Sequence, residues 1–378
     1  MNDEKLTIDG RPLRLTYVAD AWNTHTQRWV AYFRDLGCDL KVISYRAWDI
    51  PGVEVYVHSP PPQGMMAIPP LKQIHTLSDY MHVKSMLNWA DIVHVHFIYR
   101  FRFNFVFKGL QKLVVSTWGK DIITDSDDTE PSSEVYWKKY VLRQATVLTA
   151  TTHFLADATR KYSPEGKEIH VIPFGVDLDV FDPAKYPRKN PDDQPFRIGF
   201  LKHLRTKYGP DTLIEATRLI RDRGHNIRTI LAGVGDDEDE LRKLARDLGV
   251  HRIVDFVGRI PHEEVPAFMA SLDIFCMPSR WESETFGVAA VEAEAMEIPV
   301  VATSVGGVPE AVDDGVSGIL VKPNDPVAIT NSIGDLLDDP LRRREMGKAG
   351  REYVAAHYDW NENADRMKNI YLNLIQTG

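Results

Sequence analysis

Two glutamates and the residues between them form the strongest chemical pattern in the sequence. Glu284 lies in a polar loop that follows the apolar run DIFCMPS, and Glu292 lies eight positions further on. The residues between them predict a helix that begins near Gly287 or Val288, so both carboxylates would face a ligand lying over the helix N-terminus. Free backbone N–H groups over residues 286–288 would favour an anion such as a diphosphate, and each carboxylate can hold vicinal hydroxyls. Taken alone, the pattern is equally consistent with glutamates that only complement the helix dipole.

Strands must position such loops, and two series of short apolar runs predict them. The first series is RLTYVA, LKVISY, DIVHVH, KLVVST, ATVLTA and EIHVIP, and the second is FRIGFL, IRTILAG, IVDFVG, DIFCMPS, PVVATS and GILVKP. Their alternation with longer amphipathic stretches indicates βαβ units, so we expect an α/β protein with two doubly wound, mainly parallel sheets. Ligands of such sheets bind outside the carboxyl ends of the strands. Between the series, FDPAKYPRKNPDDQPF predicts an exposed linker, with the hinge near residues 180–196.

Length and composition narrow the class of protein. A chain of 378 residues exceeds one ordinary core and fits two domains. No apolar run approaches the roughly 20 residues of a membrane span, and the N-terminus lacks the basic-then-apolar order of a secretory signal, so we expect a cytoplasmic protein. Cys38 and Cys276 are too few and too far apart for a disulfide framework or a zinc site. The net charge of −9 argues against a general nucleic-acid binder.

A long segment of the C-terminal half resembles the donor-binding region of the retaining glycosyltransferases of family four, namely ESETFGVAAVEAEAMEIPVVATSVGGVPEAVDDGVSGILVKPND. This group includes glycogen synthases, sucrose synthases and bacterial mannosyltransferases. Its marker is a Glu followed by a small residue, Phe and Gly, with a second Glu eight positions after the first, and Glu284, Phe286, Gly287 and Glu292 match it. The likeness continues in DIVHVHF, STWGKDI, VIPFGVDLDVF, LAGVGDDEDELRKLA and FVGRIPHEEVPAFMA, so it spans most of the chain.

The resemblance implies a GT-B fold of two Rossmann-like domains. Residues 1–185 would bind the acceptor, and residues 196–361 would bind a nucleotide-sugar donor. A C-terminal helix over residues 362–378 would pack back on the first domain, as it does in relatives.

The same resemblance implies a role for two lysines. The segment IGFLKHLRTKYGPDTLIEA is similar to a family loop in which two basic residues reach the donor diphosphate, and Lys202 and Lys207 fall at those positions. Their ammonium groups would stabilise the charge that develops on the leaving diphosphate, whereas Arg205 is interpreted as part of a solvated turn. Glu284 would hold the transferred sugar and Glu292 the ribose. The other donor-side residues that we expect are Thr285, Phe286, Gly287, Val288 and Arg259, the last of these near the nucleotide base.

The N-terminal half departs from the family at two places. At STWGKDI many relatives carry a His before the Gly, near the transferred sugar, whereas this chain has Trp118, which cannot accept a proton. The first strand is followed by ADAWNTHTQRW, without the Gly-rich turn of many relatives, so His25 either replaces a contact there or faces solvent. The candidate acceptor-side residues are therefore His25, Trp118 and Asp121.

The sequence contains only weak patterns of metal-ligating residues. His94 and His96 alternate on one predicted strand and would face the same side, but no third ligand is apparent nearby. The Asp-x-Asp strings at Asp125–Asp127 and Asp177–Asp179 resemble a metal site of the other large glycosyltransferase fold, but acidic loops are common and the fold expected here generally works without metal. We therefore expect neither a metal nor a cofactor.

The segment HFIYRFRFNFVFKGLQK interleaves Arg100, Arg102 and Lys108 with aromatic residues at period two. This alternation predicts a strand, whereas the family resemblance implies a loop and a short helix. Cationic and aromatic groups together would suit a lipid headgroup or a lipid-linked acceptor at the inner membrane face, and an ordinary core element with basic edges explains them equally well.

The expected activity is transfer of a hexosyl group, with retention of configuration, from a nucleotide-diphosphate sugar to a hydroxyl acceptor. The acceptor would be a saccharide, a lipid-linked sugar or a small molecule, in polysaccharide or glycolipid synthesis. Two alternatives are a nucleotide-sugar epimerase of the same fold and a nucleotide-sugar-binding protein without catalysis, for which Trp118 is the only hint.

Overall fold

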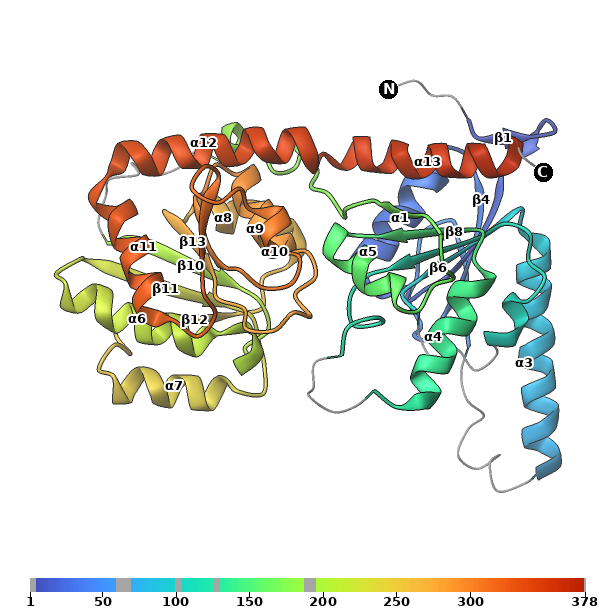
Figure 1. The fold of residues 1–378 in the computed structure, drawn as a ribbon, viewed down its shortest axis with the longest axis horizontal. Coiled ribbons are helices and arrows are strands. Elements are labelled where there is room, and N and C mark those ends of the chain that lie inside the picture. Colours follow the sequence, from blue (N-terminus) through green and yellow to red (C-terminus); the bar gives the residue numbers. More distant parts are fainter. Residues whose placement is uncertain (1–4, 59–68, 99–103, 125–129, 187–194, 377–378) are drawn as a thin grey trace. The chain divides into compact units, whose positions relative to one another are not determined.

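The computed structural model describes residues 5–58, 69–98, 104–124, 130–186 and 195–376, which form two compact units (Figure 1). Unit 1 comprises Met1–Ile172 with Ala364–Gly378, and unit 2 comprises Pro173–Asn363. The centre of the predicted linker, residues 187–194, lies outside the described residues, as do Arg100, Arg102 and Asp125–Asp127.

Unit 1 is built on a parallel sheet of seven strands in the order β5-β4-β3-β6-β7-β8-β9. The strands are β3 (Arg14–Val18), β4 (Asp39–Ser44), β5 (Glu54–Val57), β6 (Ile92–His96), β7 (Leu113–Thr117), β8 (Val147–Ala150) and β9 (Ile169–Val171). Every residue of β6 and β7 is buried, as expected for central strands covered on both faces. Because β3 pairs with β4 on one side and with β6 on the other, the winding of the sheet reverses between β3 and β6.

Helices and a short antiparallel pair complete unit 1. They are β1 (Thr7–Ile8), β2 (Arg11–Pro12), α1 (Thr24–Asp35), α3 (Pro69–Trp89), the 3-10 helix η1 (Asn104–Phe107), α4 (Ser132–Gln144), α5 (His153–Arg160) and the part of α13 (Trp360–Gln376) from Ala364 onward. The start of α1 is fixed by Asn23, whose side chain accepts hydrogen bonds from the backbone N–H groups of His25 and Thr26. This cap sets the position of the polar residues that follow β3.

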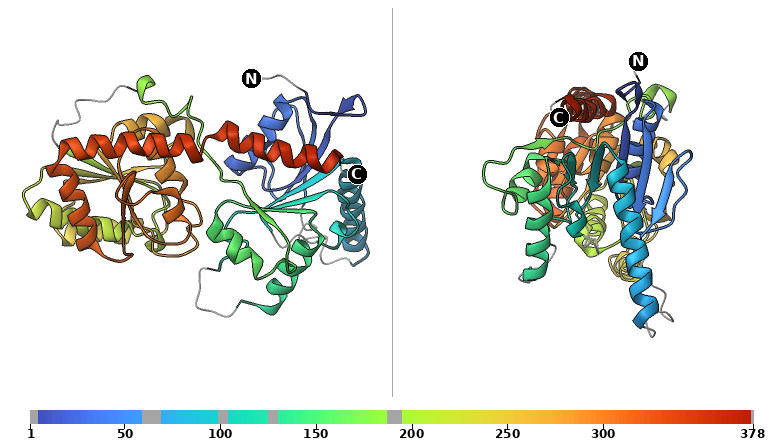
Figure 2. Two further views of the ribbon diagram at one scale, coloured as in Figure 1. Left: turned by 45° about the horizontal axis from the view of Figure 1, so that its top comes forward. Right: turned by 90° about the vertical axis from the view of Figure 1, so that its right-hand side faces the viewer.

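Unit 2 is built on a parallel sheet of six strands in the order β12-β11-β10-β13-β14-β15. The strands are β10 (Phe196–Leu201), β11 (Ile227–Ala232), β12 (Val254–Gly258), β13 (Ile274–Met277), β14 (Val300–Thr303) and β15 (Gly318–Val321). The helices are α6 (Pro210–Asp222), α7 (Glu238–Asp247), α8 (Val265–Ala270), α9 (Val288–Ala295), α10 (Val308–Ala311), α11 (Pro326–Asp338) and α12 (Pro340–His357), with short 3-10 turns η2 (Pro183–Lys185), η3 (Thr206–Tyr208) and η4 (His262–Glu264). Figure 2 shows helices on both faces of each sheet.

The predicted fold class of two doubly wound parallel sheets is confirmed. Each apolar run of the two series contains one strand, from β3, β4 and β6 to β9 in unit 1 and from β10 to β15 in unit 2. The edge strand β5 lies outside both series, and its residues are all at least partly exposed, as expected at the edge of a sheet. Residues 104–107 form the 3-10 helix η1, so the period-two alternation of that segment does not mark a strand there, and Phe107 packs into the core.

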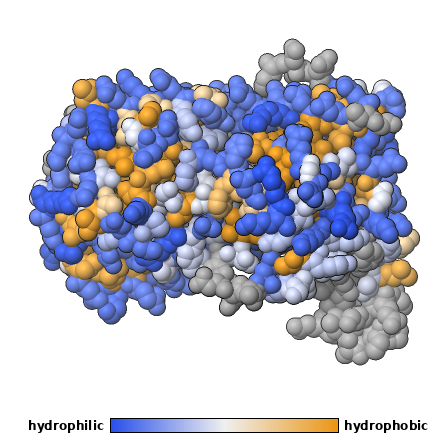
Figure 3. Space-filling model, in the orientation of Figure 1, coloured by the Kyte–Doolittle hydropathy of each residue, from blue (hydrophilic) through white to orange (hydrophobic). Residues whose placement is uncertain are grey.

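The surface carries scattered apolar residues. On the face drawn in Figure 3, they lie among hydrophilic residues over both units. Side chains that are more than half exposed include Leu77 and Met81 of α3 and Tyr136 of α4. Over the described part of the chain, none of the helices combines the length and the apolar character needed to cross a bilayer.

Candidate functional site

The start of α9 is the structural centre of the site in unit 2. Gly287 caps the helix with a φ of 89°, a left-handed conformation that favours glycine, and α9 begins at Val288 as the sequence predicted. A Cβ atom at Gly287 would lie 3.1 Å from the Cε atom of Met277, at the end of β13. Phe286 is buried, and its ring centroid lies 5.3 Å from that of Tyr358. These contacts hold the first turn of α9 beside the carboxyl end of the sheet.

Glu284 and Glu292, the two glutamates of the sequence pattern, are both buried. The backbone carbonyl of Glu284 accepts a hydrogen bond of 3.0 Å from the N–H of Gly307, in the loop after β14. The neighbouring Gly306 has a φ of 54°, and a Cβ atom there would lie only 2.3 Å from the same carbonyl oxygen. The loop after β14 can therefore approach Glu284 only because Gly306 has no side chain.

Lys202 follows β10, and its Nζ lies 2.7 Å from a carboxylate oxygen of Glu284. Burial acts to lower the pKa of Lys202, but Glu284 outweighs burial, with smaller contributions from Tyr208 and Glu292, so the pKa lies above its ordinary value. The structure thus brings three of the predicted donor-side residues into one electrostatic cluster, with the ammonium group charged.

Lys207 is the second predicted lysine, and its side chain is buried in η3. Its Nζ lies 4.9 Å from the ring centroid of Tyr208 and 5.7 Å from that of Trp281, distances at which aromatic faces attract a cation. Gly209 makes this turn possible, because its φ is 70° and a Cβ atom there would lie 2.0 Å from the carbonyl oxygen of Pro278. Tyr208 and Trp281 were not predicted from the sequence, although each stands close in sequence to a predicted charged residue.

Arg280 ties the two loops of this cluster together. Its backbone N–H donates to the carbonyl of Lys207 at 2.9 Å, and its guanidinium contacts Asp211 at 2.5 Å and Thr212 at 2.9 Å at the start of α6. Sequence reasoning missed Arg280, because nothing in its neighbourhood distinguishes it from a solvated arginine. Its contacts fix the loop after β13 against the turn that carries Lys207.

The remaining predicted donor-side residues occupy the same edge of the sheet. Thr285 is buried between Glu284 and Phe286, and Val288 is half-buried at the first position of α9. Arg259 is exposed directly after β12, and β12 is separated from β10 by β11. The structure places all of them after the carboxyl ends of strands, where ligands of this fold class bind.

A further carboxyl group of α9, Glu294, has a different environment from Glu292. It is fully buried, and the hydroxyl of Ser317 donates to its Oε1 at 2.6 Å. Its Oε2 has no hydrogen-bond partner among the described residues. Burial raises the pKa of Glu294 well above its usual range, so this carboxyl group keeps its proton to a higher pH than an exposed glutamate does.

In unit 1, His94 is fully engaged by hydrogen bonds. Its Nδ1 lies 2.5 Å from the hydroxyl of Tyr371 in α13, and its Nε2 lies 2.6 Å from the hydroxyl of Ser116 in β7. Ser116 in turn lies 2.6 Å from the hydroxyl of Thr149 in β8. Burial lowers the pKa of His94 to about 3, so its role is that of a neutral link between the sheet and α13.

The predicted acceptor-side residues lie together after β3 and β7. The ring of Trp118 lies 6.2 Å from that of His25 and 4.5 Å from that of His96, measured between centroids. Asp121 is buried, and its carboxylate accepts hydrogen bonds from the backbone N–H groups of Ile98, Trp118 and Gly119. Burial still raises the pKa of Asp121, and its oxygens serve to hold the loop that carries Trp118. Over the described residues, no cluster of His, Cys, Asp and Glu suited to a metal ion is present.

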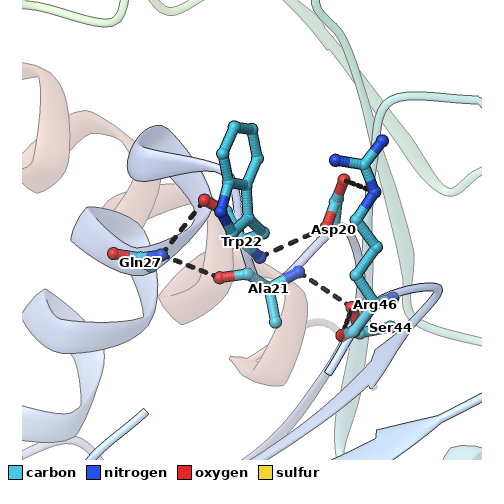
Figure 4. A network of polar contacts seen from close by, with 6 residues as sticks. All are labelled: Asp20, Ala21, Trp22, Gln27, Ser44 and Arg46. Carbon is cyan, nitrogen blue, oxygen red and sulfur yellow. Dashed lines mark hydrogen bonds and ion pairs between the residues drawn. The ribbon is translucent and has the colours of Figure 1, made fainter. Parts of the chain in front are cut away.

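A polar network braces the loop after β3, and its members come from that loop, from α1, from the end of β4 and from the residues that follow β4. They are Asp20, Ala21, Trp22, Gln27, Ser44 and Arg46 (Figure 4). Gln27 donates to the carbonyls of Ala21 and Trp22 at 3.0 and 3.2 Å, and the N–H of Ala21 donates to Ser44 at 3.0 Å. Arg46 lies 3.7 Å from Asp20 and over the half-exposed ring of Trp22. Side-chain contacts thus fix a loop that lacks the Gly-rich turn of many relatives.

Two models of known protein families match this chain. Residues 182–353 match the family model described as glycosyl transferases group 1, and residues 23–180 match the model described as glycosyltransferase family 4. Among solved structures, the chain is similar to sucrose-phosphate synthase from Thermosynechococcus elongatus, with a TM-score of 0.76, 20% identity and coverage of 97% of this chain and all of that one. It is also similar to Anabaena HepE in complex with UDP, with a TM-score of 0.76, 18% identity and coverage of 96% of this chain and all of that one. These likenesses show the GT-B fold.

Curated relatives define the family more closely. The chain is 32% identical to the GDP-mannose-dependent alpha-(1-6)-phosphatidylinositol monomannoside mannosyltransferase of Mycolicibacterium smegmatis, over 69% of this chain and 70% of that protein. It is 33% identical to D-inositol 3-phosphate glycosyltransferase 1 of Catenulispora acidiphila, over 68% of this chain and 64% of that protein, so it spans slightly less than two thirds of the latter's length. The chain belongs to the group 1 glycosyltransferases of family four.

Proposed function

We propose that this protein transfers a hexosyl group from a nucleotide-diphosphate sugar to a hydroxyl acceptor with retention of configuration. The observation that carries the proposal is the cluster of Lys202, Lys207 and Glu284 beside the N-terminus of α9. A helix N-terminus and two ammonium groups suit a diphosphate, and buried carboxylates beside them suit the hydroxyls of the attached sugar and ribose.

The two lysines would act mainly on the leaving group. Charge on the diphosphate increases as its bond to the sugar breaks, so fixed cations stabilise the transition state more than the bound donor. The aromatic rings of Tyr208 and Trp281 hold the ammonium group of Lys207 without neutralising it. Because the lysines supply this positive charge, the proposed reaction needs no metal ion.

The glutamates would position the donor and not remove a proton. Glu284 is ion-paired with Lys202, which suits a group that holds sugar hydroxyls, and Glu292 would hold the ribose. The acceptor's proton would then pass to the leaving diphosphate on the same face of the sugar. A same-face transfer retains the configuration of the donor.

Relatives suggest the chemical class of the substrates. The names of both curated relatives include an inositol, as the 3-phosphate in one and as a phosphatidylinositol glycolipid in the other, and one name specifies GDP-mannose. We therefore infer that the acceptor contains an inositol ring and that GDP-mannose is the first donor to test.

The function is tested by following turnover of GDP-mannose, UDP-glucose and UDP-N-acetylglucosamine with D-inositol 3-phosphate, myo-inositol and phosphatidylinositol vesicles. Proton NMR of the product gives its anomeric configuration, which should equal that of the donor. Glu292→Ala should weaken stabilisation by the matching nucleoside diphosphate in a thermal-shift assay while the fold survives. An inverted product, or a changed sugar nucleotide formed without acceptor, would contradict the proposal.

A further inference from the structure

The sheet of unit 1 has a ligand position defined by its topology. The winding of the sheet reverses between β3 and β6, and we call this place the switch point. In open α/β sheets, ligands bind in the crevice outside the carboxyl ends of the strands at such a point. The loop after β3 and the first turn of α1 border this position on one side, and His96, the last residue of β6, borders it on the other. The labels in Figure 1 locate α1 and β6.

His96 is the unusual residue at this position. It is 1% exposed, yet neither Nδ1 nor Nε2 has a hydrogen-bond partner among the described residues. His94, two residues earlier on the same strand, uses both of its ring nitrogens. Across the switch point, the hydroxyl of Thr26 in α1 is also buried without a described partner. Buried polar groups are nearly always hydrogen-bonded, so these atoms indicate a polar molecule that the protein itself does not supply.

The neighbours of His96 define the chemistry of that molecule. The imidazole packs among the rings of Tyr17, His94 and Trp118, with centroids 4.9, 4.3 and 4.5 Å away. Burial, with further contributions from His94 and His25, lowers the pKa of His96 well below its ordinary value, so the ring is neutral. A neutral imidazole offers one donor and one acceptor, which matches a hydroxyl group and not a phosphate.

We propose that His96 binds a hydroxyl of the acceptor's ring at the switch point of unit 1, beside Trp118. This assignment rests on the proposed function and names a contact residue for its acceptor. Trp118 stands where many relatives carry a histidine, and the imidazole of His96 lies directly beside the ring of Trp118. The acceptor group that reaches His96 is an uncharged ring hydroxyl.

The test compares the full-length wild type with His96→Phe, which keeps the ring and removes both nitrogens. With GDP-mannose and D-inositol 3-phosphate as probes, His96→Phe should lower kcat/KM for the acceptor by about tenfold, as expected for one lost hydrogen bond, and should leave the GDP-induced thermal shift unchanged. His96→Gln and His96→Asn each return one donor and one acceptor, so at least one of them should recover part of the loss. The matched control is His170→Phe, because His170 is a partly exposed histidine of β9 in the same unit.

Several results would overturn the assignment. Acceptor kcat/KM within twofold of wild type in folded His96→Phe would do so, as would a wild type that hydrolyses GDP-mannose but transfers to no inositol probe. If His96→Phe does not fold, spectra of the wild type labelled with ¹⁵N-histidine decide, because the His96 nitrogen signals must shift when D-inositol 3-phosphate is added with GDP. Failure of the proposed function itself is distinguished by the absence of any donor turnover or nucleoside-diphosphate binding in the wild type.

Discussion

The carboxyl edges of the two sheets differ in the kind of polar group they bury. In unit 2, Lys202 and Glu284 form an ion pair, and Nζ of Lys207 lies against two aromatic faces. In unit 1, His94 and His96 are imidazoles that burial keeps neutral. The same end of two sheets of the same construction thus buries an ion pair and a lysine in unit 2 and neutral imidazoles in unit 1.

This difference matches the two ligands that we propose. A diphosphate carries charge that grows during its departure, so the edge that binds it needs fixed charges. The ring hydroxyl that we propose to contact His96 carries none, so a neutral imidazole would bind it without the cost of desolvating an ion. The comparison predicts that charge-removing substitutions in unit 2 affect catalysis far more than polarity-removing substitutions in unit 1.

The largest effect is expected for Lys207→Ala. Losing a buried cation beside the leaving group should lower donor kcat/KM by about 10²–10³-fold, the range seen when one transition-state donor is removed. Steady-state kinetics with saturating acceptor measure this. The control is Arg205→Ala, since Arg205 lies in the same turn but is exposed and paired with Asp236, and it should stay within about twofold of wild type. Equal losses in the two variants would mean that overall charge, and not the Lys207 site, governs donor use.

The next effect concerns the backbone beneath Glu284. Gly306→Ala should lower the free energy of unfolding by about 3 kcal/mol, because its Cβ would meet the Glu284 carbonyl and the residue would adopt a left-handed φ. It should also reduce the thermal shift by the nucleoside diphosphate. Gly315→Ala is the matched control, because its φ is 80° but a Cβ atom there meets nothing within 4 Å, so only the conformational cost of about 1 kcal/mol is expected. Chemical denaturation separates the two variants.

A pH experiment sharpens the comparison within α9 itself. Because folding raises the pKa of Glu294, the folded state binds a proton that the unfolded state releases above its ordinary value of 4.5. Stability should therefore fall as pH rises from that value toward the folded pKa, by about 1.4 kcal/mol per pH unit for this group. Glu294→Gln should remove this contribution and be more stable than wild type at pH 8. A wild type and variant with parallel stability profiles between pH 5 and 8 would contradict a raised pKa of Glu294.

The smallest effect is expected in unit 1. Ser116→Ala removes the hydroxyl that lies 2.6 Å from Nε2 of His94 and should cost about 1 kcal/mol of stability. The nucleoside-diphosphate shift should not change, because Ser116 belongs to the neutral edge. If Ser116→Ala abolished the thermal shift caused by the nucleoside diphosphate, that result would contradict the proposed separate roles of the two edges.

Much of this arrangement was predictable from the sequence, because it depends on local patterns. The strands were marked by apolar runs, and the start of α9 was marked by Gly287 between two glutamates. The residues that were missed depend on contacts distant in the chain. Trp281, for example, flanks Lys207 because Gly209 lets the turn of Lys207 approach the loop after β13.

Local sequence patterns also could not predict that neighbouring residues of the same type have different roles. His94 and His96 look equivalent on β6, and His94 is distinguished by a hydrogen bond to Tyr371, which lies 277 residues further along the chain. Glu292 and Glu294 stand two positions apart, and Ser317 pairs with only the latter. Such differences arise from which partner the fold brings to each side chain.

The contribution of α13 to unit 1 has a consequence for the order of biosynthesis. Unit 1 contains the earliest strands of the chain, but its core also contains Tyr371, whose hydroxyl contacts His94 and lies 3.3 Å from that of Tyr17. Synthesis from the N-terminus therefore delivers all of unit 2 before the residues that complete unit 1. On the ribosome, unit 1 therefore cannot be completed until unit 2 has been synthesised.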